Sequence, residues 1–405
     1  MGSSVTRLTK SVLCLALVFV CAPCFAEAAT SRATYDKIAP PPRAASQPLP
    51  APLPPSEPIP QAAPEEASTK AAAFFPILPN DAPPETEPSF LPVASNHGLD
   101  ADHQGITRGV IVVHDFSRDA NKALAIISTL AGAENSNSMI LAPQFLLDSD
   151  ITRFANSLPE KGRAFARWPL GGWETGADSL APAPQKGISS FTVIDLLLMY
   201  FSDRSLFPDL KEIVIAGHGN GADFIQRYAA VGQAPDVVGR QGIPMHFLVA
   251  DASSYLYISI LRPRSGRQGF SPPDTNACKD FNSWPYGTGV LNAYAKRIGV
   301  NAIKTGFGTR HISYIVGENA SKTDPSPDTG CAATMQGADR PTRGINYATY
   351  IGLLYGETTS KKQDITILPD TGYDAAAIYG STCGMSVLFG DGDCTPPLLK
   401  PAGAP

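Results

Sequence analysis

Residues 211–228 constrain the fold more than any other segment of this sequence. A charged start leads into the apolar run 213–216, and three glycines spaced by two follow, Gly217, Gly219 and Gly221. Apolar side chains then recur at helical spacing. Because glycine permits sharp turns and close approach of backbones, the segment is predicted to form a strand, a tight turn and a helix.

The glycine spacing is typical of a nucleophile elbow, a turn of pattern Gly-x-Ser-x-Gly whose central serine stands strained at the top of a sheet. Here the central residue is Gly219, which has no nucleophilic atom. His218 precedes it, and side chains at that position usually point into the sheet or the next helix, so we expect it to have a packing role. The sequence therefore predicts the geometry of an elbow without its nucleophile.

Strand-like and helix-like segments alternate beyond about residue 96. Strands are expected at 109–114, 138–142, 213–216, 245–250, 312–316 and 365–368, and helices at 119–130, 191–201, 222–228, 347–354 and from 374 onward. This alternation predicts an α/β domain with a mostly parallel sheet and helices on both faces. Sites in such sheets lie at the carboxyl ends of the strands. Residues 254–292 are expected to form a lid-like insertion.

Residues 1–28 have the features of a secretory signal peptide. Arg7 and Lys10 precede a short apolar stretch at 11–20, and small residues near Ala26 suit cleavage. The apolar stretch is shorter than the roughly 20 residues that a membrane-spanning helix needs. We therefore expect a secreted or periplasmic protein with no transmembrane segment in the mature chain.

Residues 29–95 are rich in proline and alanine and are predicted to be a disordered linker. Of the 38 prolines, 17 lie between residues 40 and 92, a composition that favours extended chain. The apolar cluster 71–78 inside it either docks on the folded domain or is exposed. The folded domain is expected at 96–396, followed by a tail at 397–405.

The mature chain has four cysteines, Cys278, Cys331, Cys383 and Cys394. An even number in an exported protein favours two disulfides, although four cysteines allow three pairings. We favour Cys278 with Cys331 and Cys383 with Cys394. The net charge of -5 and the isoelectric point near 5.7 argue against a nucleic-acid partner.

Several longer motifs together are more specific than any single short pattern. They lie at 112–119, 142–145, 168–179, 189–191, 217–228, 252–257, 282–286, 317–319, 331–333, 336–340 and 369–374. On these residues the chain resembles, from about residue 109 to 389, a family of secreted bacterial and fungal α/β-hydrolases. That family is similar in plan to lipase-like and polyhydroxyalkanoate-depolymerase-like esterases. The resemblance implies the α/β-hydrolase fold.

The resemblance also implies where a catalytic triad would lie, in the chain order Ser, acid, His. The three positions hold Gly219, Ala320 and Tyr373, so all are substituted. In the oxyanion loop His114 is followed by Asp115 where the family usually has glycine, and a carboxylate there repels a developing oxyanion. No histidine follows residue 311, so no shift of alignment supplies a base after the last strand.

These observations predict an exported α/β-hydrolase-fold protein that has lost catalysis and binds a small ligand or a protein partner. The expected pocket is lined by the oxyanion-loop residues Asp115, Phe116 and Asn220 together with His114, His218, Gly219, Asn319 and Tyr373. Two alternatives stay open: an active serine esterase that uses unrecognised residues such as Ser117, Ser253 or Ser254, and a structural protein of the cell envelope. No cofactor and no metal site are expected, because no histidine pair has metal-binding spacing and no phosphate-binding glycine loop is present.

Overall fold

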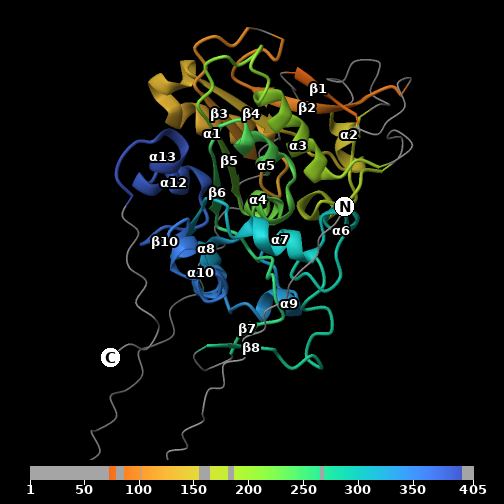
Figure 1. Ribbon diagram of the computed structural model, residues 1–405, viewed down its shortest axis with the longest axis vertical. Helices are drawn as coiled ribbons and strands as arrows, with labels where there is room; N and C mark the ends of the chain where they lie inside the picture. The colour runs from red at the N-terminus through yellow and green to blue at the C-terminus, as the bar shows by residue number, and fades with distance from the viewer. Residues whose placement is uncertain are drawn as a thin grey trace, which may run out of the picture. The chain divides into compact units, whose positions relative to one another are not determined.

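The computed structural model describes residues 73–78, 86–100, 102–154, 165–180, 187–264 and 269–394. Its centre is an eight-stranded sheet of order β1-β2-β4-β3-β5-β6-β9-β10 (Figure 1). The strands are β1 (Ala73–Ile77), β2 (Ser89–Ser95), β3 (Arg108–Val113), β4 (Ser138–Pro143), β5 (Glu212–His218), β6 (Met245–Ala250), β9 (Ile312–Gly317) and β10 (Gln363–Leu368). From β4 to β10 neighbouring strands are parallel, whereas β1 and β2 pair antiparallel at one edge. A separate two-stranded sheet joins β7 (Arg262–Pro263) to β8 (Phe270–Ser271).

Helices cover both faces of the large sheet. The α-helices are α1 (Ala120–Ala131), α2 (Asp148–Phe154), α3 (Ser190–Phe201), α4 (Asn220–Val231), α5 (Ala234–Arg240), α6 (Ala293–Ile298), α7 (Val300–Phe307), α8 (Ala320–Thr323), α9 (Cys331–Thr334), α10 (Arg340–Tyr355), α11 (Glu357–Ser360), α12 (Ala375–Tyr379) and α13 (Thr382–Phe389). Short 3-10 turns lie at η1 (Gly132–Ser136) and η3 (Trp173–Thr175). Helices α1, α12 and α13 pack on one face, and α3, α4 and α10 pack on the other.

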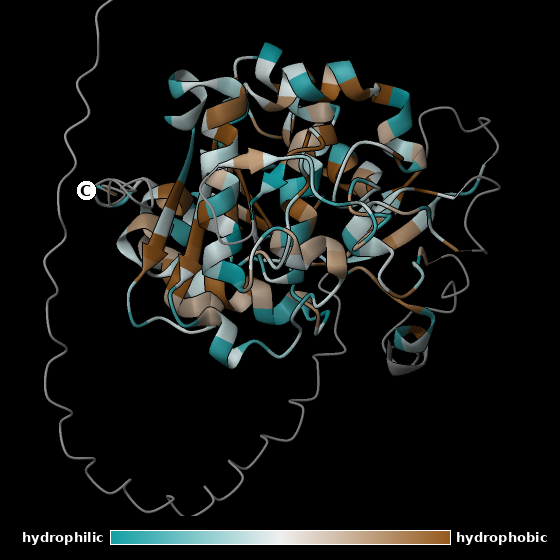
Figure 2. Ribbon diagram, turned by 90° about the horizontal axis from the view of Figure 1, so that it is seen from below, coloured by the Kyte–Doolittle hydropathy of each residue, from teal (hydrophilic) through white to brown (hydrophobic). Residues whose placement is uncertain are grey.

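Alternation along the strands explains this two-sided packing. In β5, Ile213 and Ile215 join the core beneath α4, while Val214 and Ala216 join the core beneath α1 and α13. Successive side chains of a strand point to opposite faces, so a continuous apolar run can be buried on both sides. Figure 2 shows the same arrangement, with hydrophobic strands between helices that carry mixed polar and apolar colouring.

The structure confirms the predicted α/β class and the expected strands and helices. The ends of most elements differ from the expected ends by a few residues. The largest shift is in α10, which starts at Arg340 rather than at residue 347. The expected last helix is divided into α12 and α13.

One boundary is corrected at the start of the domain. Strands β1 and β2 belong to the large sheet, although they lie inside the predicted linker at 29–95. Ile77, Leu91 and Val93 are fully buried, so this part of the segment contributes to the core. Pro76 and Pro92 interrupt the strand pattern, which is tolerated near a sheet edge. The predicted ranges 1–28 and 397–405, and the linker ahead of residue 73, lie outside the described residues.

The segment expected to be a lid packs firmly against the domain. Tyr255 and Tyr257 are fully buried beside α10, where they contact the ring of Tyr347. The indole N–H of Trp284 donates to the carbonyl of Thr175 at 2.7 Å. The insertion after β6 is therefore a packed layer of the fold.

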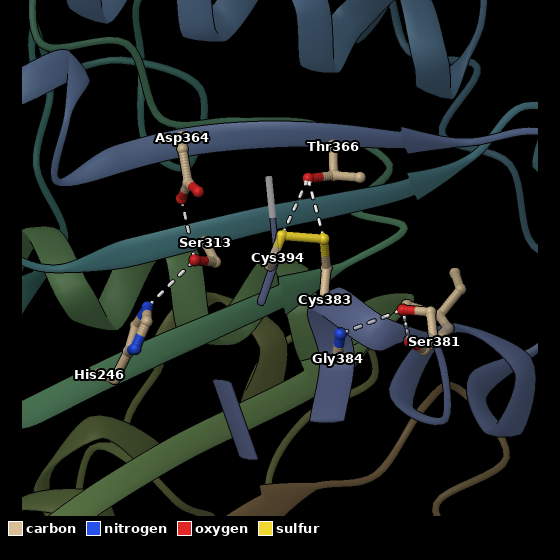
Figure 3. Close-up of a disulfide and its surroundings, with 9 residues drawn as sticks. His246, Ser313, Asp364, Thr366, Ser381, Cys383, Gly384 and Cys394 are labelled. Atoms are coloured by element: carbon tan, nitrogen blue, oxygen red, sulfur yellow. Dashed lines mark hydrogen bonds between the residues drawn. A yellow bond between two sulfur atoms is a disulfide. The ribbon is translucent and has the colours of Figure 1, made fainter. Parts of the chain in front are cut away.

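Both cysteine pairs lie at disulfide distance in the favoured pairing. The sulfur atoms of Cys278 and Cys331 are 1.99 Å apart, and those of Cys383 and Cys394 are 1.93 Å apart. The hydroxyl of Thr366 in β10 lies beside the second pair (Figure 3). Among the helices of the described residues, none is long and apolar enough to cross a membrane.

Candidate functional site

The turn between β5 and α4 has the backbone of a nucleophile elbow. Gly219 has φ 58° and ψ -119°, a conformation that residues with a side chain rarely adopt. A Cβ added to Gly217 would lie 2.3 Å from the carbonyl oxygen of Gly221, and a Cβ on Gly221 would lie 2.4 Å from that of Val113. Gly217 and Gly221 are therefore required by the close contact of α4 with β5 and β3, whereas Gly219 is favoured by its positive φ.

The space in front of Gly219 is filled by two other side chains. A Cβ added to Gly219 would lie 1.8 Å from the hydroxyl oxygen of Tyr373 and 2.3 Å from Oδ1 of Asp115. Real Cβ atoms do not approach other atoms this closely. In this conformation the elbow has no room for a serine side chain.

The Asp115 carboxylate accepts hydrogen bonds at the elbow itself. The Tyr373 hydroxyl donates to its Oδ2 at 2.7 Å, and the backbone N–H of Asn220 donates to its Oδ1 at 2.9 Å. His218 Nδ1 lies 3.8 Å from Oδ2. Burial opposes ionisation, but His218, Tyr373 and Asn220 hold the pKa of Asp115 below its usual range. Asn220 directly follows the elbow centre. In serine hydrolases of this fold, the backbone N–H at this position is one of the donors of the oxyanion hole.

His218 lies between two carboxylates. Its Nε2 is 3.2 Å from Oδ2 of Asp251, whose Oδ1 accepts the backbone N–H of Gly317 at 2.8 Å. Burial alone lowers the pKa of His218, yet Asp115 and Asp251 together raise it above its ordinary value. Both ring nitrogens thus face carboxylates within a buried cluster, an arrangement that favours the protonated ring.

His114 has a different and purely internal role. Its Nε2 accepts the backbone N–H of Phe145 at 3.0 Å, so Nδ1 carries the proton and donates to the carbonyl of Asp115 at 3.0 Å. Burial lowers the pKa of His114 to about 4, which keeps the ring neutral. This histidine fixes the loop after β3 and does not face the elbow centre with a free nitrogen.

The position of the expected acid is filled by a small buried side chain. Ala320 is fully buried at the start of α8, and the side-chain oxygen of the preceding Asn319 accepts from Lys322. The nearby Asp324 binds the Arg340 guanidinium, with Nε to Oδ2 at 2.6 Å. That guanidinium lies 4.7 Å from the ring centre of Tyr373 and so helps to fix it over the elbow.

Glu174 is a neighbour that the sequence did not single out. Its Oε1 accepts the side-chain amide of Asn220 at 3.1 Å, and its Oε2 is buried without a hydrogen-bond partner. Burial raises the pKa of Glu174. The only sequence signal for it is the motif at 168–179, which carries no chemical pattern of its own.

The structure thus brings Asp115, His218, Gly219, Asn220 and Tyr373 together, joined by Asp251 and Glu174. Phe116 lies beside them on the surface and is 38% exposed. Within the described ranges, no group of three or more His, Cys, Asp or Glu side chains is arranged to hold a metal ion.

No protein-family model and no curated protein matches this sequence. Among solved structures, LpqC, a poly(3-hydroxybutyrate) depolymerase from Bordetella parapertussis, is similar at 15% identity and a TM-score of 0.49, over 80% of this chain and 90% of that chain. Poly(aspartic acid) hydrolase-1 from Sphingomonas sp. KT-1 gives 15% identity and a TM-score of 0.47, over 76% and 96% of the two chains. The siderophore hydrolase EstB from Aspergillus nidulans gives 13% identity and a TM-score of 0.37, over 78% of this chain and 94% of that chain.

A shared substrate or activity does not follow at these identities. The strand order, the antiparallel strand β2 and the elbow between β5 and α4 identify the fold of the described chain as the α/β-hydrolase fold.

Proposed function

We propose that this protein is an exported binding protein of the α/β-hydrolase fold that does not hydrolyse esters at its elbow. One observation carries the proposal: the Tyr373 hydroxyl and the Asp115 carboxylate occupy the space that a nucleophile at position 219 needs. The signal-like residues 1–28 and the two cysteine pairs at disulfide distance support export.

The contacts of Asp115 also remove a second catalytic feature, the free N–H of the oxyanion hole. Removing the nucleophile or the histidine of a serine triad costs about 10⁶ in turnover, and the remaining rate enhancement depends on binding and the oxyanion hole. Here the N–H of Asn220 already donates to Asp115, so it is not free for a reacting oxygen. A negative charge at that place also repels a developing oxyanion.

The surface around the elbow supports a binding role. Phe116 directly follows Asp115, and Leu170, which is 88% exposed, shortly precedes the turn that carries Glu174. Glu174 also offers a buried oxygen, Oε2, that has no partner in the described structure. The Glu174 oxygen would give a ligand one polar contact, and the Phe116 ring beside the elbow would give it an apolar one.

The esterase alternative finds no base for its candidate serines. Ser253 is buried and donates its hydroxyl to Asp223 at 2.5 Å, and the hydroxyl oxygen of Ser254 accepts from Arg227 at 3.0 Å. Among the contacts of the described residues, neither hydroxyl meets a histidine. Ser117 is exposed and likewise has no histidine partner there.

The test uses the purified chain with p-nitrophenyl acetate and p-nitrophenyl octanoate, and with a fluorophosphonate that labels activated serines. An active serine esterase assayed in parallel confirms that the reagents work. We expect no turnover above buffer and no labelled serine. Labelling of any serine, or turnover that disappears in a Ser117→Ala, Ser253→Ala or Ser254→Ala variant, contradicts the proposal.

A further inference from the structure

A hollow of about 700 Å³ lies at the edge of the sheet opposite the elbow. It is bordered by α5, by the residues that lead into β6, and by residues 309–311 ahead of β9. Met245 is the first residue of β6 and His311 directly precedes β9, so the hollow is at the amino ends of these strands. The elbow is at the carboxyl end of β5. The two features are therefore separate sites, and the hollow has the size of a small-molecule pocket.

The inner surface of the hollow is largely apolar. Its lining includes the side chains of Pro235, Ile243, Pro244, Met245 and Phe247. Ile243 and Phe247 are buried in the main core, so this surface is fixed by packing. A rigid apolar surface favours a ligand with an apolar body.

One positive charge at the hollow is unpaired. Arg310 also lines it, but its guanidinium binds the Asp236 carboxylate through two contacts, at 2.5 Å and 3.1 Å. The side chain of Arg240, in the last turn of α5, is exposed and makes no hydrogen bond or ion pair with any residue that the structure describes. Within the described part of the chain the hollow therefore offers the Arg240 guanidinium without a partner, which suits a single anionic group.

The imidazole ring of His311 forms one side of the hollow, and it stacks on His246, which is fixed by polar contacts. Its ring stacks on His246, with ring centres 3.7 Å apart and an angle of 12° between the planes. His246 Nε2 is 3.1 Å from the hydroxyl oxygen of Ser313, which donates to Asp364 at 2.8 Å (Figure 3). Because Ser313 gives its proton to Asp364, it accepts from His246 and fixes that ring. His311, which is exposed, is thereby presented as a fixed surface at the hollow.

We propose that this hollow is a binding site for a small monoanion with an apolar body, such as a medium-chain or aromatic carboxylate. The carboxylate pairs with the Arg240 guanidinium, and the apolar body lies on Pro244 and Met245, which Ile243 and Phe247 support from the core. The site does not depend on the elbow, so it holds whether or not the elbow is catalytic.

The experiment titrates the purified chain with octanoate by calorimetry and by saturation-transfer NMR, with octan-1-ol as the uncharged probe of the same length. We expect saturable octanoate binding that weakens about tenfold or more in Arg240→Gln, since a charge-assisted contact is lost. Octanol binding should change less than twofold in that variant. Lys296→Gln is the matched control, because Lys296 is also an exposed cation in the last turn of a short helix.

A second variant blocks the hollow without relying on charge. Gly239 lies on α5 at the hollow, and a Cβ added there meets no atom within 4 Å, so we expect the fold to accept Gly239→Leu and the leucine side chain to narrow the hollow. We expect it to weaken octanoate and octanol alike, with an unchanged unfolding transition. The proposal is overturned if octanoate does not bind saturably, or if its affinity is the same in Gly239→Leu and Arg240→Gln as in the unaltered chain.

Discussion

Substituting Gly219 by alanine tests whether the space at the elbow is occupied. The change adds one methyl group, which meets the Tyr373 hydroxyl at 1.8 Å and Asp115 Oδ1 at 2.3 Å unless they move. The chain also offers a matched control. Gly132 has φ 52° and ψ -119°, nearly the same backbone conformation as Gly219, but a Cβ added there meets no atom within 4 Å.

The expected magnitudes follow from these two environments. A residue with a side chain in this backbone region costs about 1–3 kcal/mol, and both substitutions carry that strain. Overpacking of a filled site costs about 1–3 kcal/mol more, and only Gly219→Ala carries it. We therefore expect Gly219→Ala to lower the free energy of unfolding by about 2–6 kcal/mol and Gly132→Ala by about 1–3 kcal/mol.

Tyr373→Phe separates the clash from the strain. It removes the hydroxyl that stands closest to the added methyl group and leaves the contact with Asp115, so Gly219→Ala should lose part of its overpacking cost of about 1–3 kcal/mol in that background. Tyr373→Phe alone should cost about 1.5–3 kcal/mol, because it removes a hydrogen bond to a charged group. Strain is common to both backgrounds and cancels in the double-mutant cycle.

The assay is urea unfolding followed by tryptophan fluorescence, with the free energy taken from the midpoint and slope of each transition. Two results refute the reasoning. One is a cost for Gly219→Ala no larger than that for Gly132→Ala. The other is a cost that Tyr373→Phe does not reduce, because the hydroxyl then does not fill the position.

Three further predictions concern charge, disulfides and the first strand. Because the pKa of His218 is raised in the folded protein, its protonation stabilises the fold fully below the unfolded pKa of about 6.5, and this stability is lost as pH rises through the folded pKa. In His218→Gln the free energy of unfolding should therefore decline less steeply above pH 6.5 than in the unaltered protein. Loop entropy makes the Cys278–Cys331 bridge, which spans 53 residues, worth about 4 kcal/mol and the Cys383–Cys394 bridge, which spans 11 residues, worth about 3 kcal/mol. Cys278→Ser with Cys331→Ser should therefore lower the free energy of unfolding more than Cys383→Ser with Cys394→Ser. Peptide mapping of the unreduced mature protein should find no free thiol. Limited proteolysis should leave a core that starts ahead of β1, and a stable core that lacks β1 contradicts the place of this strand in the sheet.

The sequence was most informative where burial on both faces leaves a continuous apolar run. Strands β5 and β9 are rich in isoleucine and valine, and the glycines at the end of β5 and after it indicate the turn directly. Strands β1 and β2 were missed because Pro76 and Pro92 interrupt them. Their place in the sheet depends on pairing with each other and with β4, which local composition does not reveal.

The sequence named several of the residues that lie together at the elbow, but it did not reveal their contacts. The sequence indicated that the carboxylate of Asp115 is unsuited to an oxyanion loop. They did not reveal that its carboxylate binds the N–H of Asn220, 105 positions away, or that Tyr373 reaches the same carboxylate across 258 positions. Asp251 and Glu174 were missed for the same reason, since each acts through a partner that is distant in the chain.

The hydrogen bond from Asn220 to Asp115 makes the elbow donor subject to an internal competitor. A group tethered to its receptor by a flexible chain acts at an effective concentration on the order of millimolar or higher, and the Asp115 carboxylate is further fixed in place by the Tyr373 hydroxyl. A free carboxylate or ester oxygen must exceed this local concentration before it displaces the internal anion. Below that concentration the N–H of Asn220 therefore stays bound to Asp115. Substitution of Asp115 itself is the direct way to free this N–H for a ligand.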